Sequence, residues 1–196
     1  GFLGQSYIKN GRMSKARNLI IRALRPETRE GKESKNSFKR AENLSLLAEL
    51  HKSTGSLENM IAVYDNLLTD NHFLSKSNDP RFLSLLNRAA WNLIYMREPT
   101  KAEQVITVGA SYFLKNPEKY PNEMIAYYNA MGGIALLNKE YKQAEAYFLK
   151  VKELETKASI EIPPYLLFGL GSTYMRLAEY PKSIDYLEKG IKNHRF

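Results

Sequence analysis

Residues that could carry out chemistry are few in this sequence, and they do not form a recognisable catalytic set. The three histidines, His51, His72 and His194, are scattered, and no two lie at a spacing typical of metal ligands. Cysteine is absent, which excludes disulfides, thiol catalysis and cysteine-based metal sites. There is no evident Ser/His/Asp set or carboxylate pair. We therefore predict that the protein is not an enzyme, with no catalytic residue, no metal site and no cofactor.

Two short motifs resemble functional signatures but fall in the wrong structural context. Gly169-Leu170-Gly171 is half of a dinucleotide-binding loop, yet it lies inside a predicted helix rather than before one. Asn43-Leu44-Ser45 is a glycosylation sequon, and it also falls in a predicted helix, so it carries little weight. His51 lies at a position where two helices are expected to pack, which favours a structural role.

The elements that would position any functional residue are best seen between residues 129 and 151. This stretch predicts two short amphipathic helices joined by a tight turn. Gly132 and Ala144 are small enough to let the two helix backbones approach closely, and large residues such as Phe148 fill the remaining space. A single helix pair of this size cannot bury its own apolar face, so the unit is expected to recur.

The unit does recur, and Ala144 has four equivalents along the chain. The five anchor residues are Ala16, Met60, Ala102, Ala144 and Ser183. Five copies agree at six offsets from the anchor, which is well beyond a chance match. Twelve residues before each anchor is a small residue, namely Gly4, Ala48, Ala90, Gly132 or Gly171. Four residues after each anchor is a large apolar one, namely Ile20, Tyr64, Ile106, Phe148 or Leu187.

This pattern resembles the tetratricopeptide repeat (TPR) family, in which helix A carries a small residue and a tyrosine and helix B carries alanine and an aromatic residue. The copies around Ala144 and Ser183 match best. The anchors are 60 − 16 = 44, 102 − 60 = 42, 144 − 102 = 42 and 183 − 144 = 39 residues apart, whereas the family norm is about 34. The longer spacing is similar to that of kinesin light chains and of bacterial peptide-responsive or ATP-dependent regulators.

The resemblance implies an all-α fold, a right-handed superhelical solenoid of tandem helix-turn-helix repeats. We predict one TPR-like array over residues 1–196, in which the first repeat is truncated. The expected repeats are about 1–36, 37–78, 79–120, 121–162 and 163–196.

Prolines and glycines fall at the expected helix boundaries. Helices are predicted over residues 1–10, 14–24, 37–52, 57–69, 80–96, 122–137 and 141–155, with three more opening at Lys101, Pro164 and Pro181. Gly55 should end one helix, and Thr100 with Glu103 has the pattern of a capping box. Residues 27–36 and 70–78 are polar and are predicted to be loops, the first of them mobile.

The charge balance allows nucleic acid as a partner but does not favour it. The formal net charge is +8. Most lysines alternate with glutamates at helical spacing, as Lys142, Glu145, Lys150 and Glu153 do, which is typical of solvated helix faces. No apolar run is long enough to span a membrane, and no signal peptide is evident. The sequence begins without methionine, so we interpret it as part of a longer protein; we predict a cytoplasmic location, with a periplasmic sensor segment as the alternative.

The resemblance also implies where a partner would bind. In a TPR solenoid, the residues 15, 11, 8 and 7 positions before each anchor line a concave groove. Asn87 and Asn129 share one of these positions, and a side-chain amide can donate to and accept from the backbone of an extended peptide. The candidate partner-binding residues at and beside these positions are Asn87, Arg88, Trp91, Tyr95, Asn129, Phe168, Ser172 and Arg176.

The other candidates have more than one interpretation. Trp91 and Tyr95 lie one helical turn apart and would either anchor a partner or fill the space between adjacent A helices. Arg88 and Arg176 could each receive a carboxylate through two parallel hydrogen bonds. Binding of chaperone tails is disfavoured, because the lysine that such TPR domains use is absent here.

We therefore predict a non-catalytic module that binds a protein or peptide segment, as the scaffold or sensor part of a larger regulatory protein in signal transduction. Two alternatives are left open: a basic helical repeat that binds nucleic acid, and a structural self-assembly spacer. The oligomeric state is not predicted.

Overall fold

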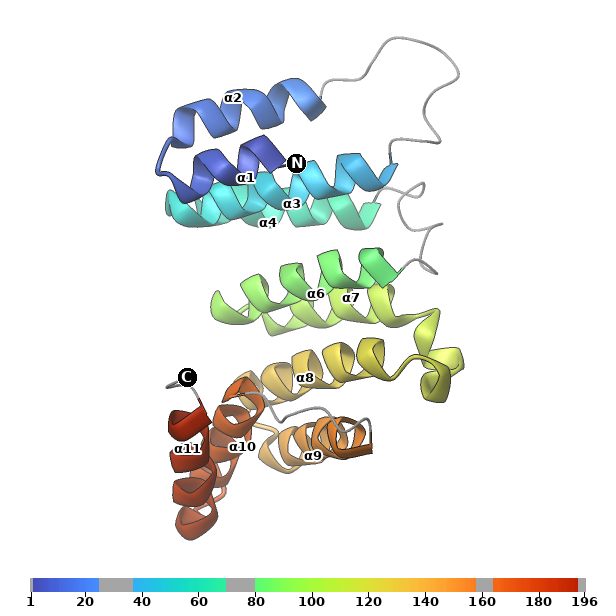
Figure 1. Cartoon of the computed structure of the whole chain (residues 1–196), viewed down its shortest axis with the longest axis vertical. Helices are drawn as coiled ribbons and strands as arrows, with labels where there is room; N and C mark the ends of the chain where they lie inside the picture. The colour runs from blue at the N-terminus through green and yellow to red at the C-terminus, as the bar shows by residue number, and fades with distance from the viewer. Residues whose placement is uncertain (1, 25–36, 70–79, 158–163, 194–196) are drawn as a thin grey trace. The chain divides into compact units, whose positions relative to one another are not determined.

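The fold is known from a computed structural model, which describes residues 2–24, 37–69, 80–157 and 164–193. Every regular element in these ranges is a helix, which confirms the all-α prediction, and the predicted loops at 27–36 and 70–78 lie outside them. The α-helices are α1 (Phe2–Lys9), α2 (Met13–Leu24), α3 (Ser37–Ser53), α4 (Leu57–Thr69), α6 (Pro80–Tyr95), α7 (Pro99–Ala110), α8 (Pro121–Leu137), α9 (Tyr141–Lys157), α10 (Pro164–Arg176) and α11 (Tyr180–Asn193) (Figure 1).

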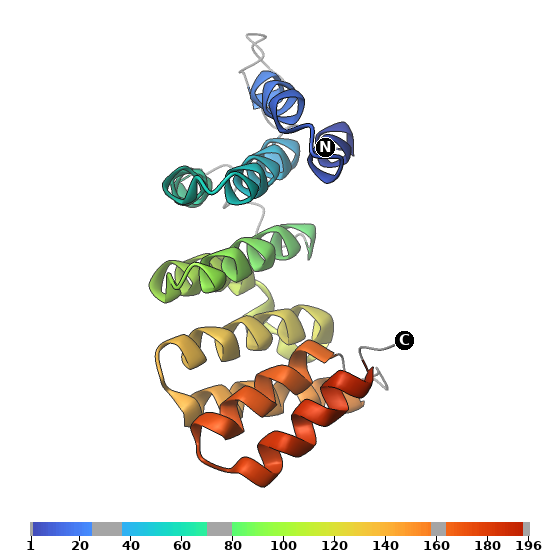
Figure 2. The same ribbon diagram turned by 90° about the vertical axis from the view of Figure 1, so that its left-hand side faces the viewer.

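Within the described residues, consecutive helices form five hairpins: α1–α2, α3–α4, α6–α7, α8–α9 and α10–α11 (Figures 1 and 2). In each hairpin the first helix is called the A helix here and the second the B helix. The helix boundaries agree with the predicted ones to within two residues, and Pro80, Pro99, Pro121 and Pro164 are each the first residue of a helix, where a missing backbone N–H costs nothing.

The chain divides into two compact units, Gly1–Leu85 and Leu86–Phe196, and the division falls inside α6. In the first unit α3 packs against both α2 and α4. In the second unit α8 packs against α7 and α9, and α10 packs against α9 and α11. The A helix of one hairpin thus contacts the B helix of the preceding hairpin within both units.

All five hairpins turn through the same backbone conformation. Among the described residues, those with positive φ are Gly11, Gly55, Arg97, Lys139 and Ala178, with φ between 59° and 72°. Each lies five positions before its anchor. The following residue donates its N–H to the carbonyl five positions earlier at 2.8–2.9 Å, and the positive-φ residue itself donates to the carbonyl three positions earlier at 3.0–3.2 Å. This pair of hydrogen bonds defines a Schellman motif, which ends the A helix.

The residue after the turn also starts the B helix. In every hairpin its carbonyl accepts the N–H of the anchor residue, at 2.9–3.1 Å. The prediction of a capping box at Thr100 and Glu103 is therefore wrong, because the N-cap of α7 is Glu98, without a side-chain hydrogen bond, and Pro99 begins the helix. The turn fixes where α7 begins, and Thr100 is already inside the helix.

Close approach of the A and B helices depends on the predicted small residues. A Cβ at Gly132 would lie 2.6 Å from Cε1 of Phe148, and a Cβ at Gly171 would lie 2.6 Å from Cγ of Leu187. Both contacts join the position twelve before an anchor to the position four after it. Phe148 is also close to Gly169 of α10, so its ring fills a narrow space at the centre of the core formed by α8, α9 and α10. Among the described residues, no helix is both long and apolar enough to cross a bilayer.

Candidate functional site

Polar side chains occupy the same buried position in three A helices. Ser45 of α3, Asn87 of α6 and Asn129 of α8 each lie fifteen residues before an anchor, and each has a buried side-chain oxygen without a hydrogen-bond partner. Asn129 is 8% exposed. A buried polar atom that lacks a partner costs about 1–3 kcal/mol, so three such atoms at one register need an explanation.

The aromatic candidates on α6 take different roles. Trp91 packs against α8, since a Cβ added at Gly133 would lie 3.2 Å from Cη2 of the indole and 3.3 Å from Cδ1 of Ile94. The geometry thus shows Trp91 filling the space between two A helices of the second unit. Tyr95 is 73% exposed, and its ring centroid lies 6.3 Å from that of Trp91 at a tilt of 47°. Tyr95 is therefore the aromatic side chain on α6 that a partner could reach.

The candidates on α10 do not continue the row of buried amides. Phe168 lies at the register of Asn129, but its ring packs on α11 of its own hairpin, where a Cβ at Gly190 would be 3.0 Å from Cε1. Ser172 is half-buried one turn further along α10, and Arg176 is exposed at the end of the helix. Arg88, beside Asn87 on α6, is half-buried. Asn87 and Trp91 thus lie on α6, and Asn129 lies on α8. Of the two arginines, Arg88 is half-buried and Arg176 is exposed.

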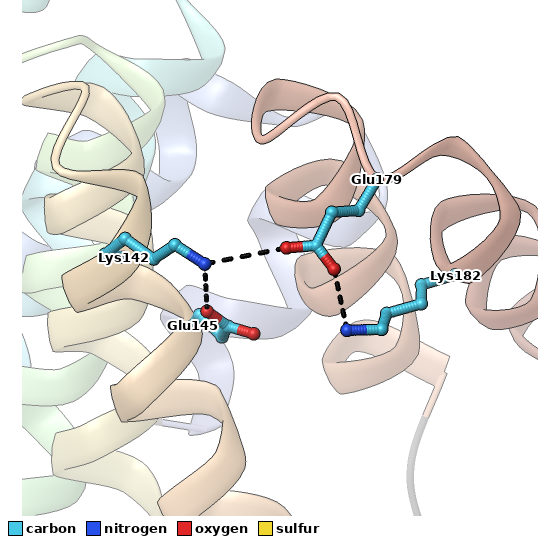
Figure 3. Close-up of polar contacts among 4 residues, drawn as sticks. All are labelled: Lys142, Glu145, Glu179 and Lys182. Atoms are coloured by element: carbon cyan, nitrogen blue, oxygen red, sulfur yellow. Dashed lines mark hydrogen bonds and ion pairs between the residues drawn. The ribbon is translucent and has the colours of Figure 1, made fainter.

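A polar cluster that the sequence analysis did not predict joins α9 to the α10–α11 turn (Figure 3). Lys142 contacts Glu145 at 3.3 Å and Glu179 at 3.5 Å, and Lys182 contacts Glu179 at 2.6 Å. The lysine side chains are mostly exposed, so each pair contributes little, typically below about 1 kcal/mol. Both lysines lower the pKa of Glu179, Lys182 the more strongly.

Two further contacts cross the same interface between α9 and the last hairpin. Tyr174 is buried, and its burial together with the nearby carboxylate of Glu145 raises the pKa of its phenol. Lys152 Nζ donates to the phenolic oxygen of Tyr186 at 3.0 Å. Side chains on one face of α9 therefore hold the following hairpin in place.

One acidic side chain is buried at the end of α9. Glu155 is 2% exposed; its Oε1 accepts a hydrogen bond from the phenol of Tyr165 at 3.4 Å, while its Oε2 has no partner. Burial raises the pKa of Glu155, and the phenol offsets this only in part. Burial and the neighbouring carboxylate raise the pKa of Tyr165 to about 12. The sequence analysis did not predict this pair, because a glutamate near a helix end is usually a surface charge.

No metal centre is evident among the described residues. They contain no group of three or more His, Asp or Glu side chains that could hold a metal ion. His51 is half-buried, and its pKa is lowered first by burial and then by the positive charge of Arg17. A neutral, partly buried imidazole suits packing between α2 and α3.

Five described hairpins share one turn geometry, and two of them share the same helix-to-helix contact at the same register. These features define the class of protein as an all-α, helical repeat-like fold. No family model matches the sequence, and no curated protein matches it.

A solved structure shares this fold: the crystal structure of BtubC (BKLC) from P. vanneervenii. The two structures superpose with a TM-score of 0.75 at 16% sequence identity, over 98% of this chain and 77% of that chain. At this level of identity the likeness concerns the fold alone.

Proposed function

We propose that the chain is a non-catalytic TPR-like module of the long-spacing type, which binds a segment of a partner protein along its A helices. The repeat interpretation is supported by the constant turn, by the Gly132–Phe148 and Gly171–Leu187 contacts at one register, and by the all-helical neighbour. In a superhelical TPR array the A helices line the concave groove, so the A-helix candidates would face the partner.

The observation that carries this proposal is the unsatisfied amide of Asn129. Its oxygen is buried without a hydrogen-bond partner, and Asn87 repeats the arrangement one hairpin earlier in the same unit. Asparagine is a poor choice for a purely structural position of this kind, because leucine has the same branching of side-chain heavy atoms and needs no partner. A half-turn about χ2 exchanges the oxygen and nitrogen of the amide, so the group can present either a donor or an acceptor to a peptide backbone.

The surrounding residues suggest the chemistry of the partner. Tyr95 offers an exposed aromatic ring on the same helix as Asn87, a type of side chain that often dominates binding energy. Arg88 on α6 and Arg176 on α10 favour a segment that carries carboxylates, and the net charge of +8 acts in the same direction over longer range. We therefore propose an extended, acidic segment as the ligand class.

Nucleic acid is the less favoured ligand. On α9 and α11, lysines pair with acidic residues of the same helix, as Lys157 does with Glu153 and Lys189 with Asp185, both at 2.6 Å. Such pairs divide the positive charge into neutral patches rather than leaving a continuous basic surface of the kind that phosphate backbones require.

The experiment is a selection of binders from a library of random 12-residue peptides, followed by calorimetric titration of the selected peptides. The key variant is Asn129→Leu, and Gln104→Leu is the matched control, because Gln104 is an exposed amide on α7, a B helix. We expect Asn129→Leu to weaken peptide binding at least tenfold while the free energy of unfolding is unchanged or higher. The control should bind as wild type does.

Three outcomes would count against the proposal. Equal peptide affinity of wild type and Asn129→Leu would show that the amide is not part of the binding surface. Failure to select any peptide would contradict the proposal that an extended, acidic segment is the ligand. Binding of unrelated duplexes with affinity that falls steeply between 50 and 200 mM salt would instead favour the nucleic-acid alternative, as expected from counterion release at about those concentrations.

A further inference from the structure

The turn between α1 and α2 contains an asparagine that is followed directly by a glycine. Asn10 and Gly11 are both exposed, and they form the one Asn-Gly pair in the sequence. An asparagine side chain can lose ammonia when the backbone nitrogen of the next residue attacks its amide carbon, Cγ. Glycine leaves this nitrogen the least hindered, because it has no Cβ. The two residues therefore make position 10 a candidate for chemical modification.

The turn between α8 and α9 provides a matched comparison within the same chain. Asn138 lies six positions before its anchor, as Asn10 does, and it is also exposed. The following residue has nearly the same backbone angle, with φ of 69° at Gly11 and 65° at Lys139. Hairpins precede and follow α8–α9 in the chain, and its turn is nevertheless exposed, so exposure at this register is a property of the hairpin itself. The main difference between the two sites is the side chain that follows the asparagine.

The closed turn holds the attacking nitrogen away from the reaction. Gly11 donates its N–H to the carbonyl of Ile8 at 3.1 Å, and Lys139 donates in the same way to the carbonyl of Leu136 at 3.2 Å. For attack, the nitrogen has to lose this hydrogen bond and turn towards Cγ of the preceding asparagine. The reaction thus proceeds from a locally opened turn, and its rate follows the population of that open form.

We propose that Asn10 is a site of spontaneous deamidation, which the closed α1–α2 turn restrains. The Gly11 nitrogen forms a bond to Cγ of Asn10 and gives up its proton, the Cγ–Nδ2 bond breaks, and the side-chain nitrogen leaves as ammonia. Water then adds to one of the two carbonyl carbons of the resulting succinimide and opens the ring. Opening at one carbonyl gives aspartate at position 10. Opening at the other gives isoaspartate, in which the main chain runs through the former side-chain carbonyl.

Isoaspartate at position 10 would open the first hairpin permanently. It adds one methylene carbon to the main chain inside the turn, between the partners of two hydrogen bonds: Gly11 N–H to Ile8 at 3.1 Å and Arg12 N–H to Tyr7 at 2.9 Å. Because these two hydrogen bonds define the turn, they cannot both form with the same geometry across a longer main chain. Either product also places a carboxylate at the C-terminal end of α1, where the helix dipole disfavours negative charge.

The first test compares the two asparagines in the folded protein during a long incubation at mildly alkaline pH. Peptide mapping by mass spectrometry detects the gain of about 1 Da when an amide becomes an acid, and electron-transfer fragmentation distinguishes isoaspartate from aspartate. We expect conversion at Asn10 to be at least about tenfold faster than at Asn138, because the glycine nitrogen is less hindered.

The second test measures the restraint that the turn imposes. In unfolding guanidinium chloride, the rate at Asn10 should rise at least about tenfold over its rate in the folded protein, because the turn is then open in every molecule. Lys139→Gly is the matched variant, since it creates a second Asn-Gly pair at the same register. In the unfolded state, Asn138 of this variant should convert at a rate similar to that of Asn10.

The third test concerns the consequence for the hairpin. The isoaspartate form carries one more negative charge than the unmodified protein, so ion exchange separates the two. In hydrogen exchange, peptides from α1 and α2 should lose protection in the isoaspartate form. Asn10→Asp is the control, because it carries the same charge on a normal main chain, and it should lose less protection.

Three results would overturn the proposal. One is equal conversion at Asn10 and Asn138 in the folded wild type, including none at either site. The second is an equal rate at Asn10 in the folded and the unfolded protein, which would show that the turn imposes no restraint. The third is unchanged protection of α1 and α2 in the isoaspartate form. Peptide binding through Asn129 is independent of all three results.

Discussion

The hairpin α3–α4 has a glycine at its turn, whereas the hairpins α8–α9 and α10–α11 have a glycine where their two helices come closest. In α3–α4 the turn residue is Gly55 and the small residue twelve before the anchor is Ala48. In α8–α9 the turn residue is Lys139 and the small residue is Gly132, and α10–α11 follows the same arrangement with Ala178 and Gly171.

The turn geometry is nevertheless the same, with φ of 72° at Gly55, 65° at Lys139 and 59° at Ala178. A non-glycine residue pays an energetic cost in this left-handed region, about 1 kcal/mol. The turn is therefore imposed by the packing of the two helices and does not depend on the residue that occupies it. In α8–α9, where Gly132 lies against Phe148, the close packing of the helices compensates for the backbone strain at Lys139.

The largest expected effect is that of Gly132→Ala. Alanine favours a helix over glycine by up to about 1 kcal/mol, but its Cβ would lie 2.6 Å from the Phe148 ring, which Gly169 confines on another side. We expect net destabilisation of about 1–3 kcal/mol, measured by urea unfolding with the fluorescence of Trp91, which packs beside Gly133. A second substitution, Phe148→Leu, should recover part of the loss in a double-mutant cycle; additive effects would show that the ring is not the obstacle.

The converse exchange in the first unit, Ala48→Gly, should cost less. Ala48 is fully buried in α3, so the change loses helix propensity and one buried methyl group, together about 1–2 kcal/mol. Urea unfolding followed by far-UV circular dichroism gives the value. A stabilising effect would mean that the methyl group of Ala48 is crowded against α4, as a Cβ at Gly132 would be against Phe148 of α9.

At the turns, Gly55→Ala should destabilise the first unit by about 1 kcal/mol. A Cβ at Gly55 would have no atom within 4 Å, so the cost would come from the backbone conformation alone. Thermal unfolding followed at 222 nm measures the change. No loss of stability would imply that the turn changes its backbone conformation when glycine is absent. The turn of α3–α4 would then be less rigid than the turns of α8–α9 and α10–α11.

The smallest expected effect is a gain. Ala178→Gly should relieve the strain at φ of 59° and stabilise the second unit by about 0.5–1 kcal/mol. Ala146→Gly is the control, because Ala146 is an exposed alanine within α9, where glycine should be destabilising by a similar amount. Equal losses in both variants would contradict the inference that the packing of the helices imposes the turn.

The sequence was sufficient to predict the helices and their pairing, because these depend on residues whose effects are local. Proline marked the first residue of several helices, and Gly132 and Gly171 marked the close contacts correctly. Arg97, Lys139 and Ala178 gave no turn signal, since their side chains do not favour a left-handed backbone and only the packing of two helices selects it. For the same reason the capping box at Thr100 was misassigned.

Sequence reasoning predicted less of the candidate site than of the helices and their pairing. Spacing placed Asn87 and Asn129 at one register, and the structure shows that both amide oxygens are buried without partners. Spacing alone could not distinguish Phe168, which packs on Gly190, from the asparagines at the same register, because the direction of a large side chain depends on which neighbour leaves space for it. Glu155 is a similar case, since its burial depends on Tyr165 of the next helix.

The turn also explains where the repeats can vary in length. One residue ends the hydrogen bonding of the A helix and begins that of the B helix, so an insertion between them would break both at once. The turn residues are 55 − 11 = 44, 97 − 55 = 42, 139 − 97 = 42 and 178 − 139 = 39 positions apart, so the changes in length fall elsewhere in each repeat. Evolution can therefore lengthen or shorten the links between hairpins, and a guest sequence inserted there would leave every hairpin closed.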